Sequence, residues 1–175
     1  MATVIRGSDN FDTSDNATQT ELDALSTGKV LQIVSSNTDT EVNTTSTSFT
    51  DTGLSATITP SSTSSKILIL TRQSTWVERS GGESANGWVN LLRGSTQINQ
   101  TFIENECGLN NESDRAVTNV VSECYLDSPS TTSAVTYKTQ QKVGFTTSSP
   151  QIATQKGGTN YFSTITLMEI AGWQK

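Results

Sequence analysis

Apolar residues occur along the chain in short runs, separated by polar runs rich in threonine, serine and glycine. Leu54, Ala56 and Ile58 alternate with polar residues, which is the period-two pattern of a strand with one buried face. Residues 66–77 begin with four apolar residues after Lys66 and predict a strand buried on both faces. The chain is therefore expected to form strands rather than long helices.

Further segments carry strand patterns at short spacing. They are residues 29–35, 44–52, 87–92, 96–103, 116–126, 133–145 and 161–170. The polar stretch 35–43 is typical of a turn. Eight to ten short strands with turn residues between them predict an antiparallel β-sandwich or barrel, and no βαβ unit fits.

Residues 1–28 precede the first predicted strand and differ from the rest. Residues 7–16 contain one apolar side chain and predict an irregular or extended arm. Thr18 and Glu21 then have the spacing of a capping box, which leaves room for one short helix ended by Gly28. So short a helix forms only where its apolar side packs on another surface. The apolar residues of this arm are Val4, Ile5, Phe11, Leu22 and Leu25.

The composition changes the expected size of the core. Of the 175 residues, 32% are hydrophobic and 16% are charged, with 30 threonines and 24 serines. Soluble domains usually have roughly 45–50% apolar residues, so a thin core is expected in the sandwich of residues 29–175. Strands covered by threonine and serine also leave sheet edges that proteins normally cover or close. We therefore expect a closed symmetric homo-oligomer.

Missing residue types exclude several function classes. The chain has no histidine, which excludes Ser-His-Asp catalysis and His-ligated metal or haem sites. A net charge of -6 without a basic run argues against nucleic-acid binding. No apolar stretch reaches 18 residues and no secretory signal pattern is visible. We therefore expect the chain to be made in the cytosol and not to insert into a membrane. No cofactor is indicated.

Carboxylates are the remaining candidates for chemistry. Glycoside hydrolysis needs two of them, about 5 to 10 Å apart, and Glu104 with Glu106 or Glu78 with Glu83 would be such pairs. Solvated loop acids are the simpler interpretation, because no run of aromatic residues accompanies them. The Asp and Asn residues of the arm match no calcium loop. We therefore predict no catalytic residue and no metal site.

Cysteine and tryptophan leave alternatives open. Cys107 and Cys124 are interpreted as reduced thiols, with Cys124 buried, although a bridge between them is compatible with the sequence. Trp76 and Trp88 are interpreted as core residues. Trp173, near the C-terminus, is either a plug that closes the sandwich or an anchor against another subunit.

Three segments resemble small virion structural proteins of tailed bacteriophages, notably those of marine bacteria and cyanobacteria. They are GKVLQIV (28–34), TTSTSFTDTGLSATITPSSTSSKILIL (44–70) and STITLMEIAG (163–172). Proteins of this kind are tail-fibre, structural or capsid-decoration proteins. The resemblance implies a place on the virion surface and a jelly-roll-like trimer, and it carries over no catalytic residue.

The leading expectation is a non-enzymatic virion structural protein, assembled in the host cytoplasm. Its arm would anchor the sandwich to a major capsid protein, a tail protein or a neighbouring subunit through the five apolar arm residues. A capsid decoration protein is favoured over a tail fibre, because the chain has room for an arm and one domain. Alternatives are a receptor-binding fibre tip, whose partner would be a host surface glycan, and, more remotely, a carbohydrate-binding module.

Overall fold

The computed structural model describes residues 29–79, 85–105, 115–145 and 149–172. Ten strands and one short 3-10 turn account for most of these residues. They are β1 (Val30–Thr38), β2 (Val42–Thr44), β3 (Thr50–Ile58), β4 (Lys66–Arg79), β5 (Ala85–Arg93), β6 (Thr96–Asn105), β7 (Arg115–Asp127), β8 (Val135–Val143), β9 (Gln151–Thr154), η1 (Gly158–Asn160) and β10 (Ser163–Ile170).

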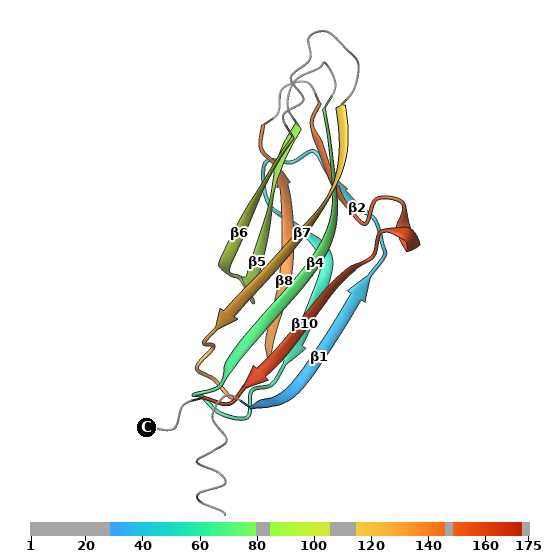
Figure 1. Ribbon diagram of the computed structural model, residues 1–175. Helices are drawn as coiled ribbons and strands as arrows, with labels where there is room; N and C mark the ends of the chain where they lie inside the picture. The colour runs from blue at the N-terminus through green and yellow to red at the C-terminus, as the bar shows by residue number, and fades with distance from the viewer. Residues whose placement is uncertain (1–28, 80–84, 106–114, 146–148, 173–175) are drawn as a thin grey trace, which may run out of the picture.

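The strands form two antiparallel sheets. Sheet A holds β1, β2, β4, β7, β9 and β10, and sheet B has the order β3-β8-β5-β6. Strands β10 and β9 lie one after the other along the same side of β4. Strand β1 pairs with β10, and β2 pairs with β9. Sheet A therefore has four strand positions, which Figure 1 shows as β1, β10, β4 and β7 side by side in one layer.

The strand pairing is nested like one long folded hairpin. The β1–β2 segment pairs with β9–β10, β3 with β8, β4 with β7, and β5 with β6. Apart from the β5–β6 hairpin, the connections between these strand positions cross from one sheet to the other. Eight strand positions in two sheets with this order are a jelly roll. The prediction of an all-β antiparallel sandwich of jelly-roll type is confirmed.

The core between the sheets consists of two apolar clusters. The first is Leu54, Ala56, Ile58, Ile67, Ile69, Leu91, Tyr137, Ile165 and Leu167. The second is Val77, Ala85, Val89, Ile103, Val121, Val143 and Ile152. The buried residues between the clusters are polar, with Thr71 and Gln73 on β4 and Thr139 and Gln141 on β8. The core is therefore thin, as the composition predicts, and interrupted by a polar layer.

Two local predictions are wrong. Part of the stretch read as a turn is strand, because Asn37 and Thr38 pair with Thr164 and Ser163 of β10. Strand β4 is also not buried on both faces, because its inner residue Ile67 is fully buried whereas Leu68 and Leu70 on its outer face are only half-buried. The outer face of sheet A thus keeps aliphatic side chains at the surface.

Candidate assembly surface

A row of aliphatic side chains crosses the outer face of sheet A. Leu126 of β7 lies opposite Leu68 of β4, Met168 of β10 lies opposite Leu68 on the other side, and Ile33 of β1 lies opposite Met168. The two ends of the row are open to solvent, with Leu126 56% and Ile33 60% exposed. Four aliphatic residues in register across four strands form a continuous strip, not scattered exposed side chains.

This strip is part of a larger surface, which we name the apolar face of sheet A. Its residues are Val30, Leu31, Ile33, Leu68, Leu70, Leu126, Met168 and Ile170. Charged residues stand at its borders. Lys66 donates to the Ser128 hydroxyl at one end, and the Arg72 guanidinium lies over the Phe162 ring at the other. An apolar centre with a polar border is the usual anatomy of a protein interface.

Cys124 belongs to the same surface. It lies opposite Leu70 in the β4–β7 pairing, and its thiol is free and exposed. The prediction that Cys124 is buried is therefore wrong, because alternation along β7 directs it outward beside exposed Leu126. Cys107 lies outside the described residues.

The predicted arm anchors lie outside the described residues. These are Val4, Ile5, Phe11, Leu22 and Leu25, and Trp173 lies outside them as well. The described chain begins at Lys29, whose carbonyl accepts a hydrogen bond from the Ala171 N–H at 2.8 Å. The described chain therefore begins at the edge strand β1, which also carries Ile33 of the apolar face.

The two described tryptophans lie outside the core, contrary to prediction. Trp76 is half-buried on the outer face of sheet A, with the Lys156 ammonium 4.4 Å from its ring centre. Trp88 is half-buried on the outer face of sheet B, beside Phe102. Each tryptophan stands next to a buried valine of the second core cluster in sequence, so alternation along the strand turns the ring outward. Residue type alone therefore does not predict whether a tryptophan lies on the core side or the outer side of its sheet.

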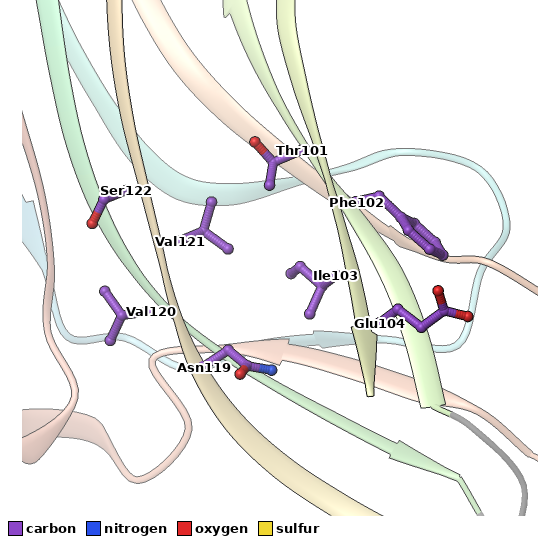
Figure 2. A pocket seen from close by; sticks show the side chains of 8 residues that line it. All are labelled: Thr101, Phe102, Ile103, Glu104, Asn119, Val120, Val121 and Ser122. Atoms are coloured by element: carbon purple, nitrogen blue, oxygen red, sulfur yellow. The ribbon is translucent and has the colours of Figure 1, made fainter. Parts of the chain in front are cut away.

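A groove of about 330 Å³ separates the edge strands β6 and β7. Figure 2 shows Thr101 and Ile103 of β6 pointing toward Val121 of β7, whereas Phe102 points away from it. The buried Glu123 carboxyl accepts a hydrogen bond at 2.7 Å from Thr101, which lines the groove, and its second oxygen has no partner in the described part of the chain. Burial raises the pKa of Glu123 against the opposing effect of that bond.

Each carboxylate pair considered from sequence has one member outside the described residues, so neither pair is placed by the structure. Glu104 is on β6 and Glu78 on β4, while Glu106 and Glu83 lie outside the described ranges. Residues 29–79, 85–105, 115–145 and 149–172 also hold no group of three or more cysteine, aspartate or glutamate residues fit for a metal ion. Among the same residues, no helix is long and apolar enough to cross a membrane.

Comparison with known proteins finds similarity among solved structures. No protein-family model matches the chain, and no curated protein sequence is significantly similar to it. The chain is similar to a mutant VP2 protein of infectious bursal disease virus, solved as derived T=1 particles. The match has a TM-score of 0.30 and 12% sequence identity, and it covers 82% of this chain and 37% of that one. At this TM-score the jelly-roll assignment rests on the strand order described above.

Proposed function

We propose that the chain is a non-enzymatic structural protein of a bacteriophage virion, whose jelly-roll sandwich associates with further copies through the apolar face of sheet A. The observation that carries this proposal is the in-register aliphatic row from Leu126 to Ile33 on that face. The jelly-roll strand order and the resemblance of residues 28–34, 44–70 and 163–172 to phage virion proteins support the virion assignment.

The physical reason for association is the cost of leaving this row in water. Full burial of one Leu, Ile or Met side chain is worth roughly 1.5–3 kcal/mol. Leu126 and Ile33 are more than half exposed in the single chain, so much of that free energy is still to be gained. A second subunit that covers the row would gain it, and would add to the stability of a sandwich whose own core is thin.

The arm has a complementary role in this proposal. Residues 1–28 directly precede Lys29 and β1, the edge strand that carries part of the apolar face. Their five apolar residues would bind a capsid or tail protein or a neighbouring subunit, while sheet B faces away from the contact. We propose a closed homo-oligomer, because closure leaves no uncovered copy of the face. The trimer is the form that the resemblance to phage virion proteins implies.

Within the virion we favour a capsid decoration protein, with a tail-fibre or receptor-binding tip as the second candidate. Gold labelling of intact phage particles with antibodies against the sandwich separates the two. Label over the head lattice supports decoration, and label restricted to the tail supports the fibre. Particles that carry no label would contradict a virion role.

A further inference from the structure

The outer face of sheet B carries two parallel rows of side chains with different chemistry. The first row runs Phe49, Lys142, Trp88 and Phe102, and the second runs Asp51, Gln140, Asn90 and Gln100. Each residue of the first row is two positions in sequence from its counterpart in the second row. Side chains two positions apart in a strand point to the same side, so both rows lie on one face. Across four strands, each row spans roughly 14 Å.

The first row is an aromatic platform. The Trp88 and Phe102 ring centres lie 4.5 Å apart at 43°, and Phe102 is 42% exposed. The Lys142 ammonium lies 4.7 Å from the Phe49 ring centre and 6.0 Å from that of Trp88. Lysine thus joins the aromatic rings into one continuous strip, with its charge held on the ring faces.

The second row is a network of amides and one carboxylate. Gln140 and Lys138 both donate to the Asp51 carboxylate, at 2.7 and 2.9 Å. On the other side Asn90 donates to Gln97 at 2.9 Å, and Gln97 donates to Gln100 at 2.8 Å. A bulge between Asp51 and Ser55, with Gly53 at φ 81°, places Asp51 opposite Gln140. The face therefore presents fixed hydrogen-bond donors and acceptors beside the aromatic strip.

The side-chain oxygen of Asn90, which belongs to this network, accepts no hydrogen bond from the described residues. Asn90 is 2% exposed, so this oxygen is buried. A buried amide oxygen without a donor is costly, and such groups in native proteins usually have a reason. Here the oxygen lies beneath the surface of the amide row, between Gln140 and Gln100, and the hydroxyl of a bound molecule would become its donor once a neighbouring amide side chain moves aside.

The charges of the face indicate the kind of molecule that fits it. Lys138 is paired with Asp51, and the remaining charges of the face are one lysine, Lys142, and one exposed carboxylate, Glu104, two residues beyond Phe102 on β6. The face therefore has no excess charge, whereas a nucleic acid requires clustered cations. A pyranose ring has an apolar side of C–H groups and a border of uncharged hydroxyls that both donate and accept. This chemistry complements an aromatic strip lying next to a row of amides.

We propose that the outer face of sheet B binds a neutral polysaccharide, with its sugar rings on Trp88 and Phe102 and its hydroxyls on Asp51, Gln140, Asn90 and Gln100. This site is on the opposite sheet from the apolar face of sheet A, and it does not rest on the virion assignment. Loss of association would leave it intact, and loss of sugar binding would leave association intact.

The test is affinity electrophoresis of the full chain in gels that contain laminarin, galactomannan, xylan, dextran or the acidic polymer alginate. We expect retardation by at least one neutral polymer, and no stronger retardation by alginate. Trp88→Ala and Gln140→Ala should each weaken the binding by about tenfold, and Trp88→Tyr should retain most of it. Retardation by no neutral polymer, or by alginate alone, would overturn the proposal.

The matched control is Trp76→Ala. Trp76 is also half-buried on an outer sheet face and has a lysine ammonium over its ring, but it lies on sheet A. The Trp76→Ala variant should bind the polymer as the native chain does. Its thermal midpoint should shift about as much as that of Trp88→Ala. Equal loss of binding in both variants would show a general loss of structure and would count against the site. A further readout is tryptophan fluorescence, where the polymer-induced change should vanish in Trp88→Phe and persist in Trp76→Phe.

Discussion

The backbone N–H and the hydroxyl of Ser61 both donate to the same carboxylate oxygen of Glu169, at 2.7 and 2.6 Å. The Ser65 hydroxyl donates to that oxygen as well, and Gln32 donates to the other at 2.6 Å. Glu169 is fully buried at the end of β10, so this carboxylate joins the β3–β4 loop to the neighbouring strands β10 and β1 of sheet A. Burial opposes its ionisation, but the four hydrogen bonds outweigh burial and lower the pKa to about 2.

The first prediction is that acid weakens the fold through Glu169. Because the folded-state pKa lies below the ordinary value, this carboxylate contributes stability that is complete above pH 4.5 and is lost as the pH falls toward 2. The contribution is roughly 3 kcal/mol. Glu169→Gln should remove most of it at pH 7 and flatten the dependence of unfolding free energy on pH between 4.5 and 2. Urea unfolding at several pH values measures this, and an unchanged acid dependence would be incompatible with it.

Glu123 should show the opposite dependence. Its pKa is raised mainly by burial, so the cost of ionising it appears as the pH rises above the ordinary value of 4.5. Glu123→Gln keeps the side-chain shape and an acceptor for Thr101 while removing the charge. We expect this variant to gain stability relative to the native chain at pH 8 and to gain less at pH 4. A variant that is less stable at pH 8 would refute this assignment.

Much of the fold could be predicted from the sequence, because period-two alternation follows directly from strand geometry. Strands β3, β7 and β10 were recognised in this way. Short strands β2 and β9 were missed, because Val42–Thr44 and Gln151–Thr154 have few apolar residues and are held by pairing with each other and with β4. Such partners are far apart in the chain and leave no local pattern.

The candidate surfaces were less predictable. Alternation shows that a strand has two faces, but not which one is covered by the second sheet. Trp88 and Leu68 were assigned to the core by residue type, and both lie on outer faces. The rows that give these faces their chemistry depend on register across four strands, which only the sheet order reveals. The jelly-roll type came from resemblance, not from the residue pattern.

Gln73 gives a prediction about the polar layer of the core. It is 1% exposed, and neither its side-chain nitrogen nor its oxygen has a hydrogen-bond partner among the described residues. Replacement by an apolar residue of similar size removes the cost of burying an unpaired amide. Gln73→Met should therefore raise the free energy of unfolding by about 1–3 kcal/mol. Thermal and urea unfolding measure the change, and a loss of stability would show that the amide is well satisfied in solution.

Removal of the arm tests its anchoring role. A chain lacking residues 1–27 keeps every described strand, so it should fold with the same far-ultraviolet circular dichroism and a similar thermal midpoint. If Val4, Ile5, Phe11, Leu22 and Leu25 are the anchors, the truncated protein should no longer attach to particles that bind the full chain. Co-sedimentation with phage particles is the measurement, and equal binding by both forms would rule out anchoring by the arm.

Association through the apolar face of sheet A is the central claim, and sedimentation equilibrium tests it most directly. The native chain should have three times the mass of one chain, and Ile33→Lys with Leu126→Lys should have the mass of one. A matched control, Ser55→Lys with Thr57→Lys, places two lysines on exposed positions of sheet B and should leave the trimer intact. A native chain with the mass of one subunit, or a double variant of sheet A that keeps the native mass, would contradict the claim.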